Sequence, residues 1–350
     1  MKTRWLGENR EWLGVFRVLL LAWLWVSAAV AEVPEVTNRT LDDGTVEFQI
    51  RGLKTPPARL VIEDIRTAKR VATVKKIAPA QSVEGFTAAW KPGRVEGVYV
   101  ARLYDRNGVE IDMPREMPSG AADDVKVLNV EISGRDEHVS WSTDRAALVR
   151  VNAGLDGGMF IKMVSPWRFA ASGAHRTPWD FWDDDRVAHY KDSRALQVYA
   201  LAVPLPSFLI VVGQPDFATY RDLPLFRGFG SLADGYTFDV EVMGASTVHD
   251  AAFPGRTIPV VVPGDRLRLR LDEPTRRALA RERFEYLFYL NGEFFYEESD
   301  ASDPTTVVWP GEGLGAGLQL LTVNIFSFSN GYGSRTIPIL VQSRGTGGQL

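Results

Sequence analysis

The feature that most constrains this chain is the alternation of apolar and polar side chains over short segments. The alternation is clear in residues 45–51 (TVEFQIR), 58–66 (ARLVIEDIR) and 97–105 (GVYVARLYD). A period of two places the apolar residues on one face of an extended strand, whereas an amphipathic helix needs a period near 3.6. The sequence therefore predicts antiparallel β-sheet with one buried face.

Turn signals separate these segments at short intervals. They are Asp42-Asp43-Gly44, Pro56-Pro57, Lys91-Pro92-Gly93 and Asn107-Gly108. The Asn-Gly pair is the most specific of them, because both central positions of a tight hairpin favour positive φ. Only residues 274–286 have a helical pattern, with Pro274 suited to a first helical turn. Short strands at regular spacing favour an all-β fold built from antiparallel sandwiches.

The strands fall into three rounds, which predict tandem immunoglobulin-like β-sandwiches. The expected organisation is a signal peptide at 1–31, domains at 32–115, 124–213 and 235–343, a linker at 214–234 and a tail at 344–350. The linker region carries six large apolar residues: Phe217, Tyr220, Leu223, Leu225, Phe226 and Phe229. Such a segment is expected to pack against a neighbouring domain and to fix the angle between domains.

The N-terminus predicts export from the cytoplasm. A basic leader precedes an uncharged block at 18–30, and Ala29-Val30-Ala31 fits a signal-peptidase site before Glu32. The alternative is a retained membrane anchor, but the block is shorter than the roughly 20 residues that a spanning helix needs. Cleavage would leave no transmembrane anchor, and we expect the protein in the periplasm or outside the cell.

Composition excludes several functional classes. The chain has no cysteine, which rules out disulfides, thiolate catalysis and cysteine-based zinc sites. Removing the leader leaves 36 basic and 42 acidic residues, so the surface gives no electrostatic reason to bind nucleic acid. An exported chain of this kind must be stabilised by apolar burial.

Residues 85–110 resemble the Ig-like repeat of the flagellar hook-capping protein and of many exported bacterial proteins. The matching positions are Trp90, Gly93, Gly97, Tyr99, Asp105 and Gly108. Residues 173–186 resemble a degenerate copy of the same repeat. Trp179, Asp180 and Asp183 match it, but Phe181 and Arg186 replace the expected glycines.

Residues 314–341 are similar to another exported Ig-like pattern, in which a turn leads into a strand reading LTV. These resemblances imply a fold and an exported setting. Repeats of this kind serve as spacers, assembly modules or adhesive units, so the resemblance implies no reaction.

The stretch HRTPWDFWDDDRVAHY (175–190) contains the candidate metal ligands. Calcium prefers oxygen ligands, and a loose site could be formed by Asp180, Asp183, Asp184 and Asp185. The EF-hand template fails, because Val187 and Ala188 occupy a ligand position and the glycine position. The alternatives are a histidine–carboxylate site that includes the flanking His175 and His189, or a solvated turn in which Trp179 is core and Trp182 covers an edge.

Catalytic motifs are missing from the chain. Neither HExxH nor GxSxG is present, and adjacent aspartates on one turn cannot flank a glycosidic bond. We therefore expect a protein that is not an enzyme. The alternative is a carbohydrate-active hydrolase, or its accessory subunit, with carboxylates at a domain junction.

Residues 286–298 (YLFYLNGEFFYEE) predict an aromatic hairpin around Asn291-Gly292. One face of its first strand carries Tyr286, Phe288 and Leu290, and the other carries Leu287 and Tyr289. If one face enters the core, the other is free to bind a partner or a glycan. The hypothetical binding surface consists of Tyr286, Tyr289, Phe294, Phe295, Tyr296 and Trp182. The alternative is a strand buried on both faces by the adjoining linker.

Taken together, these patterns predict a non-catalytic exported binding or structural module that contacts a protein or a glycan in the cell envelope. A subunit of an extracellular appendage assembly, and hence an oligomer, is a further alternative. No cofactor other than calcium is expected.

Overall fold

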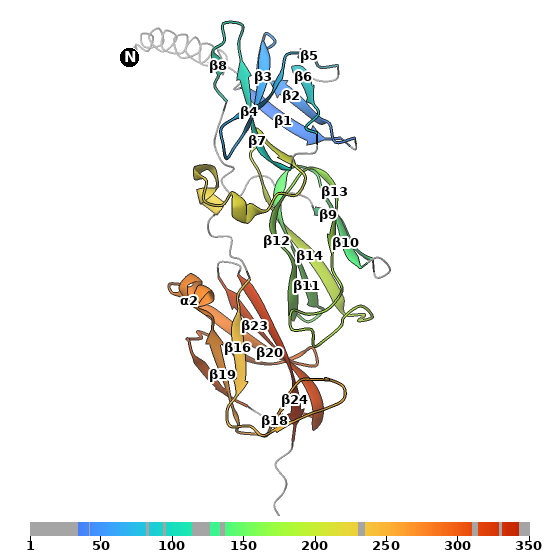
Figure 1. The fold of residues 1–350 in the computed structure, drawn as a ribbon, viewed down its shortest axis with the longest axis vertical. Helices are drawn as coiled ribbons and strands as arrows, with labels where there is room; N and C mark the ends of the chain where they lie inside the picture. Colours follow the sequence, from blue (N-terminus) through green and yellow to red (C-terminus); the bar gives the residue numbers. More distant parts are fainter. Residues whose placement is uncertain are drawn as a thin grey trace, which may run out of the picture.

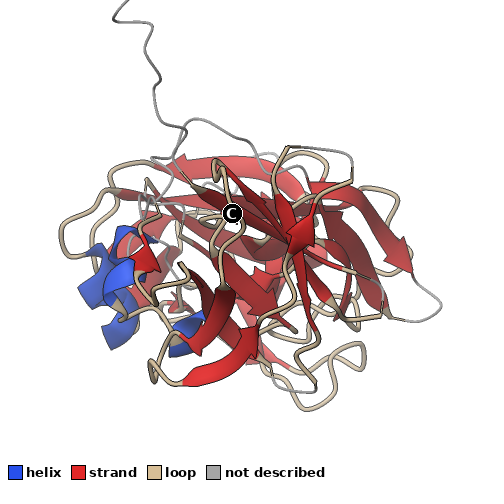
Figure 2. Cartoon of the chain, turned by 90° about the horizontal axis from the view of Figure 1, so that it is seen from above, coloured by secondary structure: helices blue, strands red, loops and turns tan. Residues whose placement is uncertain are grey.

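Antiparallel sheets account for nearly all of the regular structure, and they form three sandwiches in a row (Figure 1). The computed structural model describes residues 34–41, 43–81, 84–93, 96–113, 127–133, 137–229, 235–309, 314–328 and 331–342. The predicted signal peptide and tail lie outside these residues. In Figure 2, the helical segments lie to one side of the strands. The expected all-β fold of tandem Ig-like sandwiches is confirmed.

The first domain packs two sheets face to face. One sheet has the order β1 (Glu35–Thr40), β2 (Val46–Arg51), β6 (Phe86–Trp90) and β5 (Ala78–Pro79). The other contains β7 (Gly97–Tyr104), β3 (Arg59–Asp64) and β4 (Arg70–Val74), with β8 (Glu110–Ile111) paired to β7. Alternate residues of these strands fill the core, where Trp90 and Tyr99 meet edge to face at 5.3 Å.

A strand from much later in the chain completes the first domain. β15 (Leu209–Val212) pairs antiparallel with β7, from Leu209 opposite Val100 to Val212 opposite Gly97. Ile210 has no exposed surface and lies in the core of the first domain. The expected boundary at residue 213 assigned this strand to the second domain, and its sheet membership corrects that assignment. Its apolar run fits any buried sheet, so the sequence alone did not identify its partner.

The second domain has two three-stranded sheets. Their strands are β9 (Val127–Ser133), β10 (His138–Thr143), β13 (Gly173–Pro178), β11 (Ala147–Leu155), β12 (Phe160–Ala170) and β14 (Leu196–Pro204). The orders are β13-β10-β9 and β12-β11-β14. Trp141, Trp179 and Phe181 lie in the core between them.

The third domain packs the sheet β16-β19-β22 against the sheet β17-β18-β24-β23-β20-β21. The first comprises β16 (Phe238–Val242), β19 (Arg266–Leu271) and β22 (Thr305–Val308). The second comprises β17 (Thr247–Val248), β18 (Ile258–Val261), β20 (Phe284–Leu290), β21 (Glu293–Glu298), β23 (Gly317–Ser327) and β24 (Tyr332–Val341). The pairing of β18 with β24 is parallel.

The expected helix at 274–286 is confirmed in its first half. α2 spans Glu273–Leu279, has Pro274 in its first turn, and is capped by the Asp272 carboxylate, which accepts from the Thr275 N–H. Residues from Phe284 onward belong to β20, because their backbone pairs with β23.

The linker region packs as the sequence predicts. It forms the short 3-10 helices η1 (Phe217–Thr219) and η2 (Pro224–Phe229). The rings of Phe217, Tyr220 and Phe226 surround Phe169 of β12 at 5.7, 5.3 and 5.2 Å. The same cluster includes Val98 of β7, so the linker joins the first two domains through one apolar core.

Replacing Ile210 tests the dependence of the first domain on β15. We expect Ile210→Ala to lower the free energy of unfolding by about 2–4 kcal/mol, because it leaves a cavity in a buried core. Amide exchange should quicken in β3 and β7, which the sequence separates from residue 210 by the whole second domain. The control is Val109→Ala at a position that is 61% exposed, expected to cost less than about 0.5 kcal/mol. Loss of protection confined to the second domain would contradict the assignment.

Candidate functional site

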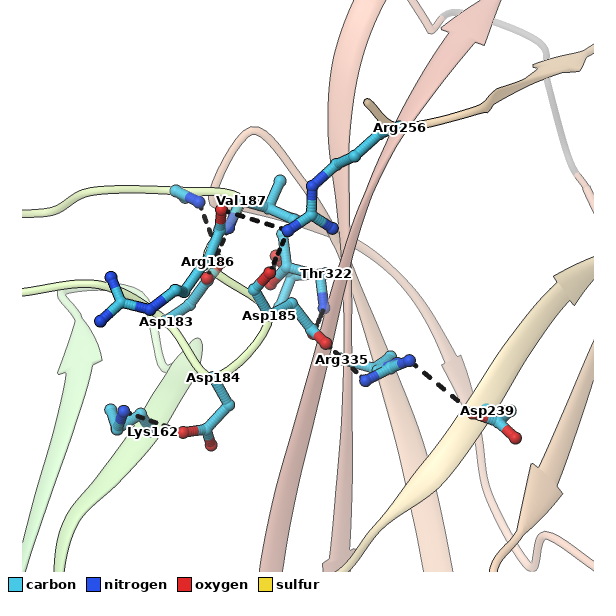
Figure 3. Close-up of polar contacts among 12 residues, drawn as sticks. Lys162, Asp183, Asp184, Asp185, Arg186, Val187, Asp239, Arg256, Thr322 and Arg335 are labelled. Atoms are coloured by element: carbon cyan, nitrogen blue, oxygen red, sulfur yellow. Dashed lines mark hydrogen bonds and ion pairs between the residues drawn. The ribbon is translucent and has the colours of Figure 1, made fainter. Parts of the chain in front are cut away.

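The two regions that the sequence singles out meet at the junction of the second and third domains. The acidic turn, residues 180–185, follows β13 of the second domain. The aromatic hairpin, formed by β20, Asn291-Gly292 and β21, belongs to the third. Contacts from both regions cross the junction, and Figure 3 shows those of the acidic turn.

Both faces of the first hairpin strand are buried. Tyr286, Phe288 and Leu290 lie in the core of the third domain, as their spacing predicts. Tyr289 is only 2% exposed, and together with Leu287 it packs into the core of the second domain. Tyr286 on one face and Tyr289 on the other are therefore both buried and do not offer a surface to an external partner. The covering element is the second domain, not the linker that the alternative named.

The other residues of the hypothetical surface are divided between core and solvent. Phe295 packs against Trp309 at 5.4 Å, and Tyr296 packs against Phe288 at 5.4 Å, so both are partly buried in the third domain. Trp182 is partly buried beside His189, with ring centroids 4.9 Å apart. Phe294 is 53% exposed. The six residues therefore do not form one continuous surface.

Asp185 connects the acidic turn to the third domain. Its carboxylate accepts a hydrogen bond from Arg335 at 2.5 Å and another from the Thr336 backbone N–H at 2.6 Å (Figure 3). Arg256, also in the third domain, donates to the backbone carbonyl of Asp185 at 2.5 Å and to that of Arg186 at 3.3 Å. Because the bonds involve charged groups and a backbone donor, they fix the orientation of the two domains as well as their contact.

The other aspartates of the turn have separate partners. Asp183 is 3% exposed and accepts from the backbone N–H groups of Val187 and Ala188 at 2.8 and 3.1 Å. Asp184 pairs with Lys162 at 2.9 Å, and Asp180 pairs with Arg186 at 2.7 Å. Asp183 therefore shapes the turn from within.

This geometry does not support the expected calcium site. The four carboxylates point to four different sets of donors, and no three His, Asp or Glu side chains converge to hold a metal within the described parts of the chain. His175 stacks on Trp141 at 4.3 Å, and His189 bonds to the Asp180 carbonyl. The histidine–carboxylate alternative therefore has no support either. Trp179 lies in the core, as the alternative of a solvated turn expects, but Asp183 is buried and Asp185 is partly buried, and both accept hydrogen bonds.

Burial also changes the acidity of this turn. Desolvation raises the pKa of Asp183 and of Asp185 above the ordinary aspartate value. The bonds from Val187 and Ala188 to Asp183, and from Thr336 and Arg335 to Asp185, oppose that rise. Protonation of either group is thus easier in the folded protein than in the unfolded chain.

A second polar contact at the junction was not found from the sequence. Asn324 of β23 has no exposed surface, accepts the Phe160 N–H at 2.8 Å and donates to the Phe160 carbonyl at 2.7 Å. Its side chain thus pairs with β12 as a neighbouring strand would. The only signal was one amide in the apolar run LLTVNIF.

Aromatic rings enclose a buried arginine beside this contact. The Arg150 guanidinium lies 5.0 Å from the Trp167 ring and 4.8 Å from the Tyr332 ring, and Arg150 has no exposed surface. Tyr332 also packs against Phe160 at 5.6 Å. Because Arg150 and Trp167 belong to the second domain and Tyr332 to the third, the cation–π contacts add to the cohesion of the junction.

The open pocket beside the acidic turn does not fit the hydrolase alternative. A glycosidase needs two free carboxylates on opposite sides of a cleft. One pocket contains Glu137 and Asp180 beside Trp179, but the Asp180 carboxylate is paired with Arg186. At the domain junction, Asp183 and Asp185 are already bonded to backbone and arginine donors.

Comparisons with known proteins identify no family for this chain. No family model and no curated protein matches the chain. Among solved structures, the fibronectin(III)-like modules of Clostridium thermocellum CbhA are 7% identical, cover 91% of this chain and 95% of their own, and have a TM-score of 0.22. A tetra-tandem repeat from the extending region of a large adhesion protein is 14% identical, with coverage of 88% and 74% and a TM-score of 0.20.

A third match is red sea bream transglutaminase, 11% identical, with coverage of 79% and 40% and a TM-score of 0.20. Likenesses at these scores assign no function. The class that the strands themselves define is a tandem Ig-like all-β protein, and the resemblance to the hook-capping repeat stays a prediction. No helix among the described residues is long and apolar enough to cross a membrane.

Removing the Asp185 carboxylate should loosen the junction. We expect Asp185→Ala to lower the free energy of unfolding by about 2–3 kcal/mol, because it leaves Arg335 and the Thr336 N–H without their acceptor. The matched control is Asp184→Ala, whose side chain is 56% exposed, against 10% for Asp185. That exposed pair should contribute less than about 1 kcal/mol. If urea unfolding shows equal losses of unfolding free energy for the two variants, the Asp185 bonds do not stabilise the junction more than the exposed pair does.

The raised pKa of Asp183 predicts a pH effect of definite sign. Between the ordinary aspartate pKa of about 3.9 and the raised folded value, the folded state retains a proton that the unfolded chain has lost. This group's contribution to stability is therefore greatest at low pH and is lost as pH rises through that window. Asp183→Asn removes the titration, so its unfolding free energy should fall less with rising pH than that of the wild type. Parallel curves from urea unfolding at several pH values would refute this.

Proposed function

We propose that this chain is a non-catalytic exported module that works as a stiff rod, holding protein or glycan contacts at a fixed separation in the cell envelope. The observation that carries the proposal is the Asp185–Arg335 contact together with the Asn324–Phe160 contact. Both tie the second domain to the third through bonds that depend on direction. Asp185 and Tyr289, two of the residues that the sequence singles out for binding, contact the neighbouring domain.

The junction of the first and second domains also supports a stiff rod, through strand pairing and apolar packing. β15 extends a sheet of the first domain immediately after the chain leaves the second, and the linker rings pack against both. A tether between independent domains would be polar and would bury little apolar surface. Here each junction contains buried aromatic side chains, so the domains are expected to move as one body.

The exported setting of this proposal depends on the leader at 1–31, and the absence of cysteine is compatible with it. The carbohydrate-active hydrolase is the weaker candidate. Asp183 and Asp185, at the junction of the second and third domains, are engaged in structural bonds. Asp43 and Asp144, which line a pocket between the first and second domains, pair with Lys91 and Arg145.

Distance measurements between the outer domains test the rod. The chain has no cysteine, so Arg106→Cys in the first domain and Thr306→Cys in the third give two exposed, unique sites for spin labels. We expect one narrow distance distribution in the doubly labelled protein. Adding Asp185→Ala and Asn324→Ala should broaden it, whereas adding Asp184→Ala should not. A broad distribution in the parent protein would refute a stiff rod.

A further inference from the structure

Several described strands lie at a sheet edge, and two of them, β4 in the first domain and β21 in the third, combine an edge position with a biased charge. β4 pairs only with β3 at the end of its sheet, and β21 pairs only with β20 at the end of the six-stranded sheet. The outer backbone N–H and C=O groups of such strands are free to pair with another strand.

The two edges carry opposite charge. Residues 65–81, which contain β4, have five basic side chains and no acidic one: Arg66, Lys69, Arg70, Lys75 and Lys76. Residues 291–309, which contain β21, have five acidic side chains and no basic one: Glu293, Glu297, Glu298, Asp300 and Asp303. All five basic residues are exposed, and so are Glu293, Glu297 and Asp300. The two segments therefore carry strong opposite charge, although the net charge of the whole chain is only −4.

Each edge also exposes one large apolar residue. Val71 on β4 is 46% exposed, and Phe294 on β21 is 53% exposed. A strand paired along either edge would cover these side chains, and burial of apolar area stabilises such a contact.

The charges decide which edges can pair. Two β4 edges, or two β21 edges, would place like charges opposite one another, which is destabilising across strands. A β4 edge against a β21 edge places Lys and Arg opposite Glu. Within one chain the two edges belong to the first and third domains, which the second domain separates (Figure 1). The complementary edge must therefore come from another molecule.

We propose that the basic edge strand β4 of one copy pairs with the acidic edge strand β21 of a second copy. The pairing joins the β15-β7-β3-β4 sheet of one molecule to the six-stranded sheet of the next. Because the two surfaces differ, the contact is head-to-tail and leaves a free edge at each end for further copies. The chain already adds one distant strand to a sheet edge, where β15 pairs with β7.

This inference goes beyond the proposed function, because a stiff spacer needs no self-association. The test uses residues 32–350, which contain every described residue, and measures mass by light scattering and sedimentation over a range of protein concentration. At low ionic strength, about 20 mM salt, we expect the average mass to rise with concentration to at least twice that of the monomer. At about 500 mM salt, screening should return it to the monomer.

Charge reversal makes the test specific. One variant carries Arg70→Glu with Lys75→Glu, and the other carries Glu293→Lys with Glu297→Lys. Each alone should stay monomeric at low salt, because its altered edge falls from five like charges to three opposed by two and no longer complements the other edge. An equimolar mixture should assemble, because the unaltered acidic edge of the first variant complements the unaltered basic edge of the second. Lys191→Glu with Arg194→Glu, two exposed residues of the second domain, is the matched control and should assemble like the wild type.

Several results would overturn the proposal. These are a wild type that stays monomeric at low salt, reversal variants that assemble alone, or a mixture that does not regain assembly although both variants show native thermal unfolding. If the wild type is monomeric but gives a narrow distribution of spin-label distances, the stiff rod is supported and the head-to-tail pairing is overturned.

Discussion

Burial of apolar side chains between neighbouring domains is the constraint on which this structure depends. The chain has no cysteine, so no disulfide links the domains. Each sandwich has its own core, but the clusters around Phe169 and Tyr289 take residues from two domains each. The domain junctions are therefore parts of the hydrophobic cores. A destabilising substitution at a junction should lower the stability of both neighbouring domains.

The second junction shows how polar groups add direction to this burial. Apolar surfaces alone would allow the second and third domains to slide, because dispersion contacts do not depend strongly on angle. Asp185 and Asn324 each bind backbone groups of the opposite domain, at Thr336 and Phe160. Bonds to backbone N–H and C=O groups admit one register only, as ladder bonds do in a sheet. These hydrogen bonds therefore fix the position of the second domain relative to the third.

Much of the fold could be predicted from the sequence, because periodicity and turn chemistry are local. The Asn291-Gly292 turn is one example, since both residues adopt positive φ, at 51° and 89°. The candidate sites could not be predicted, because an apolar face such as Leu287 and Tyr289 looks the same whether it meets a partner or a neighbouring domain. Asp185 differs from Asp184 through its bonds to Arg335 and Thr336, which lie 150 and 151 residues away. Contacts at that separation leave no local pattern to read.

The position of β15 also bears on the order in which the chain acquires its structure. The first domain cannot complete its sheet at β7 until residues 209–212 have been synthesised, after all the strands of the second domain. Until then β7 presents an open backbone edge and an incomplete core to whatever surrounds the nascent chain. An N-terminal domain that waits for a strand encoded about a hundred residues later needs protection for that interval. The first domain is therefore synthesised before the second, but it completes its sheet only after the second has been synthesised.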